Sequence, residues 1–227
     1  MPALKRLRQN LALIIGVGIG IAALAVLLLP DREMLHARGP MNIGHEALRC
    51  EYCHRPARGS LRQQLQANAR FLLGLRATQT DFGLQPAGSA QCLACHDRPT
   101  DRHPVFRFNE PRFQEARAAI QPESCISCHL EHRGVRVTVA SLDYCQHCHE
   151  DTRLKNDPVD IPHETLIADE QWTSCLGCHD FHGNHLMETV RRLDDAIAPE
   201  RIRAYLDGGE SPYGTDKRHE PRKKPPP

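Results

Sequence analysis

The sequence predicts a mainly α-helical chain with much irregular loop, preceded by one transmembrane helix at the N-terminus. Three observations support this fold class. A long apolar run lies near the start, a short motif of cysteine and histidine recurs five times, and 227 residues include only one Trp, four Tyr and six Phe. So few aromatic side chains are poorly suited to filling a core. We therefore expect bound groups to supply part of the apolar volume.

The N-terminal segment has the composition of a membrane-spanning helix. Lys5, Arg6 and Arg8 precede an uncharged apolar run over residues 11–29. At about 1.5 Å per residue this run forms a helix about 28 Å long, enough to cross the hydrocarbon layer of a bilayer. The basic flank should remain in the cytoplasm, which places everything after Pro30 on the outer side.

A cleaved signal peptide is the competing interpretation, with Ala23-Leu24-Ala25 as its processing site. The apolar residues continue beyond Ala25 to Leu29, and the run is longer than the apolar region of an ordinary signal peptide. This favours an uncleaved anchor. A buried helix of a soluble protein is disfavoured because the run has no polar face. Both leading interpretations export the rest of the chain.

The pattern Cys-x-x-Cys-His occurs five times and uses all ten cysteines. In this pattern two thiols form thioether bonds to the vinyl groups of a haem, and the imidazole reaches the iron from the same face. The expected thioether residues are Cys50, Cys53, Cys92, Cys95, Cys125, Cys128, Cys145, Cys148, Cys175 and Cys178. The expected proximal iron ligands are His54, His96, His129, His149 and His179. We therefore expect five covalent haem c groups.

Two other uses of paired cysteines are structural zinc sites and disulfides. Neither requires a histidine directly after every second cysteine, and all five motifs have one. Zinc knuckles also belong mainly to reducing compartments, whereas the N-terminal run indicates export. Haem attachment is the interpretation that accounts for both features.

The remaining histidines include candidates for the second axial position of each iron. Electron-transfer haems are typically closed by a second strong ligand, which also sets the reduction potential. The distal candidates are His45, His103, His132, His163, His182 and His185, with one of the last two expected to serve. A histidine so close to its own motif cannot easily reach the opposite face of that haem, so His132 and His182 are expected to bind the iron of a neighbouring motif.

All five motifs lie within about 130 residues, so we expect a compact chain wrapped around five stacked haems. Helices are expected over residues 60–76 with Ser60 as N-cap, over 110–120 with Pro111 in the first position, and over 186–197 and 199–206. Residues 135–139 read as a short strand or a loop.

The expected organisation is an anchor over residues 1–30, a haem domain over 31–206 and a disordered tail over 207–227. The tail is rich in Lys, Arg and Pro and offers little to bury. Its basic residues could touch an acidic partner or anionic lipid, although a solvated tail is the simpler interpretation. Basic and acidic residues are nearly balanced over the whole chain, so nucleic acid is not an expected partner.

The five motifs, the local form CISCHLEHRG and the interspersed histidines resemble the class III multihaem cytochromes c. Together with the N-terminal span, the plan is similar to the pentahaem subunit of alternative complex III and, more loosely, to the NapC/NirT-type quinol dehydrogenases. The resemblance covers roughly residues 45–185 and rests mainly on the Cys-x-x-Cys-His motifs. It implies haems with two histidine ligands arranged as a chain.

These features predict an electron carrier in the cytoplasmic membrane, single-pass, with its haem domain in the periplasm. The expected donor is a quinol-oxidising membrane protein or complex, and the expected acceptor is a periplasmic cytochrome or reductase. One alternative is a small multihaem reductase, which needs one iron with an open distal position. Another is a subunit that mainly holds a larger membrane complex together.

Overall fold

The computed structural model describes residues 2–27, 29, 35 and 37–224. The chain forms two compact units, Met1–Pro40 and Met41–Pro227. The first unit contains a single long helix, and the second unit contains all five Cys-x-x-Cys-His motifs.

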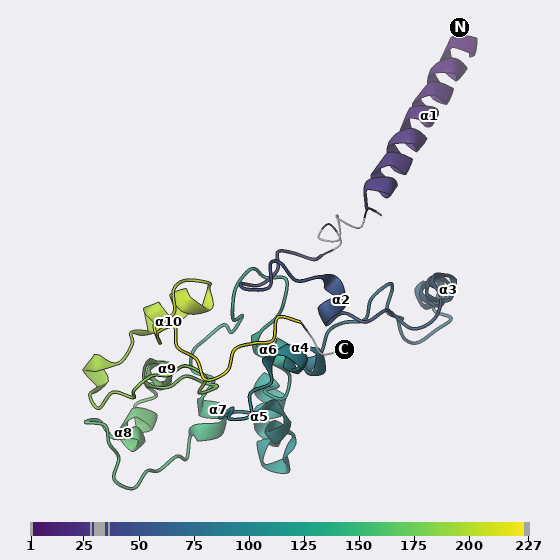
Figure 1. Ribbon diagram of the computed structural model, residues 1–227. Coiled ribbons are helices and arrows are strands. Elements are labelled where there is room, and N and C mark those ends of the chain that lie inside the picture. Colours follow the sequence, from purple (N-terminus) through teal and green to yellow (C-terminus); the bar gives the residue numbers. More distant parts are fainter. Residues whose placement is uncertain (1, 28, 30–34, 36, 225–227) are drawn as a thin grey trace. The chain divides into compact units, whose positions relative to one another are not determined.

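Helix α1 (Pro2–Leu27) is the long helix of the first unit (Figure 1). Its segment Arg6–Leu27 is long and apolar enough to cross a membrane, and none of this segment is buried inside the protein. A signal sequence near the N-terminus would meet the same criterion. The expected helix is therefore present, and its length and composition are compatible with an anchor.

The second unit consists of short helices joined by long irregular segments (Figure 1). The α-helices are α2 (Cys50–Cys53), α3 (Leu61–Leu72), α4 (Ser89–His96), α5 (Gln114–Ile120), α6 (Cys125–Cys128), α7 (Gln146–His149), α8 (His163–Ala168), α9 (Cys175–Cys178) and α10 (Pro199–Leu206). The 3-10 helices are η2 (Val105–Asn109), η3 (Pro111–Phe113), η4 (Trp172–Ser174) and η5 (Leu193–Asp195). The described residues contain isolated β-bridges and no strands, so the predicted mainly helical class is confirmed and residues 135–139 form a loop.

Helix α3 begins as the sequence predicts. Ser60 is its N-cap and forms a reciprocal capping box with Gln63. The helix ends at Leu72, four residues earlier than expected (76 − 72 = 4). Gly74 has φ of 71°, its N–H donates to the carbonyl of Phe71, and the next N–H donates to Arg70. This is a Schellman ending, which glycine favours because a positive φ carries no Cβ penalty there.

Of the other three helix predictions, one is confirmed, one holds in part and one is wrong. The predicted helix over 199–206 is α10, and the predicted helix over 110–120 is divided into η3, which starts at Pro111, and α5. Residues 186–197 are not an α-helix and contain only η5. The backbone of Leu186 is instead extended beside the C-terminal segment and donates to the carbonyl of Asp216 at 2.9 Å.

The core of the second unit is small, as the aromatic content suggests. Its buried members are Leu142, Leu176, Ile202, Leu206 and Tyr213. Ile202 of α10 is fully buried, and the hydroxyl of Tyr213 donates to the carbonyl of Leu176 in α9 at 3.0 Å. The core therefore packs α10 and the C-terminal segment against the fifth cysteine motif.

The C-terminal segment corrects the expectation of a disordered tail for residues 207–224. His185 and Lys217 form a β-bridge, and the N–H of Arg218 donates to the carbonyl of Asn184 at 2.8 Å. Further along, the N–H of Arg222 donates to the carbonyl of Cys95 at 2.9 Å. The ring of Tyr213 packs in the core, and the backbone N–H and C=O groups of the polar residues around it are paired in hydrogen bonds. Residues 225–227 lie outside the described part of the chain.

Candidate haem-binding sites

Each Cys-x-x-Cys-His motif lies in a short helical turn, in α2, α4, α6, α7 or at α9. In four of the motifs the N–H of the histidine donates to the carbonyl of the first cysteine, as in His54 to Cys50 at 2.8 Å and His179 to Cys175 at 2.9 Å. In the remaining motif, α4 continues through His96. Residues three and four positions apart share one side of a helical turn. The turn therefore presents two sulfur atoms and one imidazole to the same side.

Cysteines of different motifs interact in two places: the side chain of Cys92 with that of Cys125, and the side chain of Cys145 with that of Cys175. The second motif is thus adjacent to the third, and the fourth is adjacent to the fifth.

The five motif histidines each face one other histidine of the chain. The ring centres are 5.8 Å apart for His96 and His45, 6.2 Å for His54 and His132, 6.1 Å for His149 and His103, 6.2 Å for His129 and His182, and 6.2 Å for His179 and His163. All five partners belong to the predicted distal candidates. Each partner lies near a motif other than the one whose histidine it faces, or in a loop between two motifs. Of the two candidates after the fifth motif, His182 is the one that lies opposite a motif histidine.

This separation is too large for rings in contact and fits one metal ion between them. The ring of Phe181, which does stack on that of His103, has its centre only 4.2 Å away. A metal–imidazole bond is about 2.0 Å long and a ring nitrogen lies about 1.1 Å from the ring centre, so two imidazoles on one iron have centres about 6.2 Å apart. The five histidine pairs therefore fit the spacing of five bis-histidine irons.

Two of the motif histidines, His54 and His129, are oriented by backbone carbonyls. The Nδ1 atom of His54 lies 2.8 Å from the carbonyl oxygen of Gln85, and that of His129 lies 2.9 Å from the carbonyl oxygen of Arg136. A carbonyl accepts only, so Nδ1 carries the proton and Nε2 keeps its lone pair. This is the tautomer that a metal-binding histidine needs, and such partners also fix the plane of the ring.

Three of the facing histidines are oriented by carboxylates instead. The Nδ1 atoms of His45, His163 and His182 lie 3.0, 2.9 and 3.1 Å from carboxylate oxygens of Glu131, Asp157 and Asp101, respectively. His103 donates from Nδ1 to the carbonyl of Phe181. A carboxylate that accepts from Nδ1 makes the imidazole a stronger electron donor to a metal at Nε2.

Residues 44–150 match the family model of cytochrome c3. The match supports a multihaem c-type cytochrome with covalently bound haem c and an electron-carrier role. It includes the first four cysteine motifs, whereas the fifth motif lies beyond its end. No curated protein and no solved structure matches the chain.

Burial favours the neutral form of several of these imidazoles. Burial lowers the pKa of His96 to about 4, with further lowering from the nearby His45 and Arg98. Burial also lowers the pKa of His129 and of His103. A neutral imidazole is the form that binds a metal.

The carboxylates beside the facing histidines are ionised at neutral pH. For Glu131, burial alone would raise the pKa, but the hydrogen bonds from His45 and from the N–H of Asn42, together with the electrostatic interactions with His45 and His132, outweigh it, and the net pKa lies below the ordinary value. The same balance, with His182 as the partner, lowers the pKa of Asp101. Together with Asp157, these anions lie next to three of the candidate iron ligands.

His185, the sixth distal candidate, has a different environment. Its Nδ1 lies 2.9 Å from Asp180, and its ring centre lies 5.1 Å from that of Tyr213. The Nε2 atom is buried and has no hydrogen-bond partner among the described residues. His185 therefore packs with the core beside Tyr213 and lies opposite none of the motif histidines of the described chain.

Sequence reasoning did not identify the residues that orient the facing histidines. These are Asp101, Glu131, Asp157 and the carbonyl of Phe181. Short local patterns carry part of the signal, because Asp101 lies two residues before His103 and Glu131 directly precedes His132. Each of these two carboxylates, however, binds a histidine from a distant segment, His182 or His45, which spacing along the chain does not reveal.

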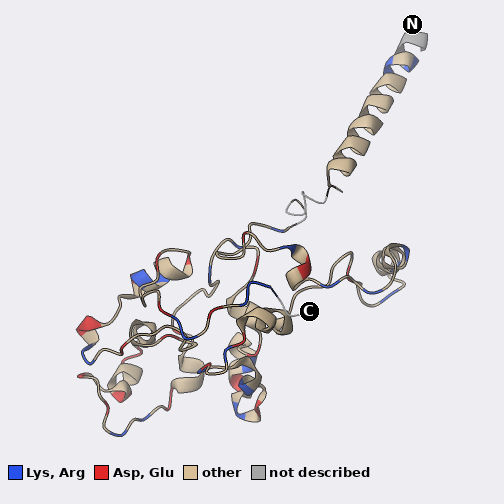
Figure 2. Ribbon diagram, in the orientation of Figure 1, with Lys and Arg blue, Asp and Glu red and all other residues tan. Residues whose placement is uncertain are grey.

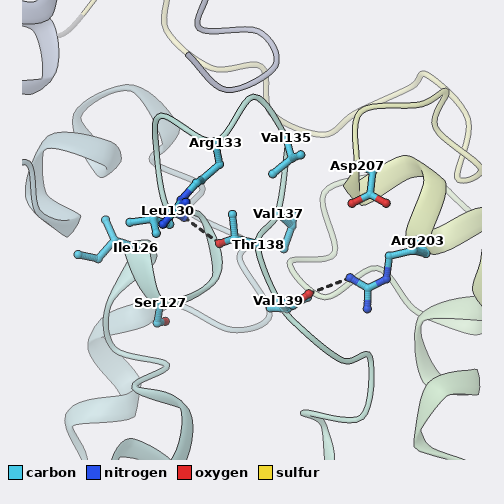
Figure 3. A pocket seen from close by; sticks show the side chains of 10 residues that line it. All are labelled: Ile126, Ser127, Leu130, Arg133, Val135, Val137, Thr138, Val139, Arg203 and Asp207. Carbon is cyan, nitrogen blue, oxygen red and sulfur yellow. Dashed lines mark hydrogen bonds between the residues drawn. The ribbon is translucent and has the colours of Figure 1, made fainter. Parts of the chain in front are cut away.

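A separate hollow of about 480 Å³, lined by both polar and apolar side chains, lies beside α6 (Figure 3). It is lined by Ile126, Ser127, Leu130, Arg133, Val135, Val137, Thr138, Val139, Arg203 and Asp207. Two hydrogen bonds shape it, from the N–H of Leu130 to Thr138 and from Arg203 to the carbonyl of Val139. None of its lining residues is a cysteine or a histidine, so it is distinct from the spaces between the histidine pairs.

Proposed function

We propose that this chain is a membrane-anchored pentahaem c-type cytochrome that relays electrons between a membrane quinol-linked donor and a periplasmic acceptor. The observation that carries the proposal is the set of five facing histidine pairs, each with one motif histidine. In the proposal the ten cysteines hold five haems as thioethers, and the five pairs bind the irons. When bound, each haem supplies reversible one-electron exchange at its iron.

Two histidines per iron favour a carrier over a reductase. Reduction of an oxyanion at a haem needs one iron with an open distal position. Each motif histidine has a facing imidazole 5.8 to 6.2 Å away, so every proposed iron is closed on both sides. The protein then acts on potentials through axial ligands and their hydrogen bonds rather than through substrate binding.

The contacts between motifs support a relay in sequence order over the first three haems. Helices α2 and α4, which carry the first and second motifs, contact each other, as do α4 and α6, which carries the third. The sulfur contact between Cys92 and Cys125 joins the second motif to the third. Cofactors held by touching attachment turns lie close together, which short electron-transfer steps require.

The third and fourth haems would be joined through the segment around Phe181. The ring of Phe181 contacts His103, which faces the fourth motif's His149, and lies edge-on to His182, which faces the third motif's His129. The fourth and fifth motifs are joined by the contact between Cys145 and Cys175. The proposed electron path therefore runs from the first to the fifth haem, or in reverse, along the order of the sequence.

The membrane part of the proposal rests on α1 and its basic flank. The segment Arg6–Leu27 is compatible with a single span, and basic residues before it favour a cytoplasmic N-terminus. This orientation would place the haem unit in the periplasm, where c-type haem can be attached. A quinol-oxidising membrane protein is then the natural donor, and a periplasmic cytochrome or reductase the natural acceptor.

The number of haems and their ligation test the proposal directly. The intact mass of the mature holoprotein should exceed that of its polypeptide by five haems, and the double variant Cys175→Ser/Cys178→Ser should carry four. Electron paramagnetic resonance of the oxidised protein should contain only low-spin ferric signals. A mass equal to the bare polypeptide would overturn the whole proposal, and four haems in the unmodified protein would remove the fifth site.

The paired histidines after the fifth motif provide a matched test of ligation. His182→Ala should open one iron, which then shows a high-spin ferric signal and binds carbon monoxide when reduced. His185→Gln keeps a polar side chain beside Asp180 and should leave all haems low-spin. The opposite result would assign His185 as the ligand and contradict the proposed pairing.

A further inference from the structure

Helix α3 turns its leucines outward. Leu61, Leu65 and Leu72 lie within one stripe of the helix because they are separated by four and seven positions. Their side chains are 59%, 54% and 83% exposed. Leu73 and Leu75, directly after the helix, are each 72% exposed. A soluble protein ordinarily turns such a stripe towards its core, so an outward stripe suggests a binding surface.

Two polar side chains beside the leucine stripe, Gln64 and Asn68, fix the orientation of α3. Gln64 is 5% exposed; its amide nitrogen donates to the carbonyl of Gly59 at 3.0 Å, and its amide oxygen accepts from the N–H of Gly83 at 2.9 Å. The amide oxygen of Asn68 accepts from the N–H of Thr80 at 2.9 Å. Turning the leucines inward would break these bonds and leave buried polar groups unpaired.

The base of this lobe is tied to the first haem motif. The N–H of Ala57 donates to Gly83 at 2.8 Å, and the N–H of Gln85 donates to Arg55 at 2.7 Å. The carbonyl of Gln85 in turn accepts from His54. Residues 55–85 therefore form a lobe closed at its neck beside the first motif, with α3 as its exposed part (Figure 1).

Arginines dominate the charge of the lobe, in which Asp81 is the single acidic residue. Residues 52–80 contain five arginines, Arg55, Arg58, Arg62, Arg70 and Arg76, and no acidic residue. All five are exposed. Figure 2 shows basic and no acidic residues on α3. Exposed leucines next to exposed arginines match the surface of a bilayer, which is apolar inside and can carry anionic headgroups at its boundary.

We propose that α3 binds the surface of a bilayer containing anionic lipids, with its leucine stripe in the interface and its arginines at the headgroups. Such a helix, amphipathic and basic with low overall hydrophobicity, is the type that lies in the plane of a membrane. The inference rests in part on the proposed anchor, which keeps a membrane within reach of this chain. It adds a second contact with lipid, at the first haem motif, which would fix the orientation of that motif towards the bilayer.

Hydrogen–deuterium exchange on the full-length holoprotein in lipid nanodiscs tests this surface. Amides of residues 61–75 should exchange about tenfold more slowly in discs with phosphatidylglycerol than in detergent, because lipid contact suppresses local opening. Discs of phosphatidylcholine alone should give weaker protection, and added salt should reduce the difference between the two lipids. Equal exchange in detergent and in both kinds of disc would overturn the inference.

A matched pair of variants separates lipid contact from helix stability. Leu61→Ser/Leu65→Ser/Leu72→Ser should abolish the lipid-dependent protection, whereas Gln66→Ser, at an exposed polar position of the same helix, should retain it. Protection that appears only when a redox partner protein is added would show a protein interface and contradict a lipid surface. Failure of the anchor would be seen separately, as a holoprotein that does not remain on the discs at all.

Discussion

The ring of Phe181 stacks on the imidazole of His103 with the ring centres 4.2 Å apart and the planes inclined by 12°. The carbonyl oxygen of the same phenylalanine accepts a hydrogen bond from Nδ1 of His103. In the sequence, Phe181 lies two positions after His179 and directly before His182. Each of these histidines faces a different histidine partner. The segment 179–182 therefore contacts three of the five proposed haem sites.

Phe181→Ala should loosen this junction. Loss of the half-buried ring removes the stack on His103 and should lower the free energy of unfolding by about 2–4 kcal/mol. The orientation of His103 should become less defined, so the low-spin signal of one haem should broaden in electron paramagnetic resonance while the haem count is unchanged. Phe181→Leu keeps the carbonyl and most of the apolar volume and should change stability by less than about 1.5 kcal/mol. Unchanged spectra and stability in the alanine variant would show that the ring has no positioning role.

Glu131→Gln should raise the reduction potential of one haem. The ionised Glu131 accepts from Nδ1 of His45 at 3.0 Å, which makes this imidazole a stronger donor and favours ferric iron. An amide in its place can still accept from His45 through its one oxygen, but it loses the charge and the hydrogen bond from the N–H of Asn42. The potential of the second haem should therefore rise by about 20–60 mV. Redox titration of the visible spectrum measures the shift. Glu110→Gln, whose carboxylate contacts only exposed arginines, is the control and should have no effect.

Asn42 is a buried polar residue whose hydrogen bonds should contribute to the free energy of unfolding. It is 3% exposed; its amide donates to the carbonyl of Leu130, and its oxygen accepts from the N–H groups of Arg133 and Gly134 at 3.0 and 3.1 Å. These bonds hold the turn that contains His132. Asn42→Ala leaves the carbonyl of Leu130 and the N–H groups of Arg133 and Gly134 without this partner and should lower the free energy of unfolding by about 1–3 kcal/mol. A thermal melt followed in the Soret band should shift downwards, whereas the exposed Asn109→Ala should melt like the unmodified protein.

Much of the local architecture follows from the sequence, because it depends on neighbouring residues. The capping box at Ser60, the helix over 199–206 and the apolar N-terminal helix all arise from interactions within one or two turns. The five cysteine motifs are equally local, since three bonds to one haem must come from five consecutive residues. The family match over residues 44–150 agrees with the multihaem class that these motifs indicate.

The remaining features depend on contacts between distant segments. Which distal histidine faces which motif depends on how the loops cross, as for His132 and His54 or His182 and His129. The sequence also does not predict that the leucine stripe of α3 faces outward, because the helical period of the leucines is the same whether they face the core or the solvent. Here buried bonds of Gln64 decide the orientation, and the partners of these bonds lie in two loops on either side of the helix.

The C-terminal segment gives the sharpest contrast between composition and structure. Residues 207–227 read as disordered, yet Tyr213 is 8% exposed and its hydroxyl donates to Leu176. Ending the chain after residue 207 should remove this side chain from the core and lower the free energy of unfolding by about 3–5 kcal/mol. Tyr213→Phe keeps the ring and should cost only about 1 kcal/mol for the lost hydrogen bond. Removal of residues 225–227 alone is the control, and all three variants are compared by thermal melting of the holoprotein. If the chain that ends after residue 207 melts at the temperature of the full chain, the segment does not contribute to the core. A lower melting temperature in this truncation that the Tyr213→Phe variant does not share would assign the stabilisation to the buried ring and the backbone pairing of the segment.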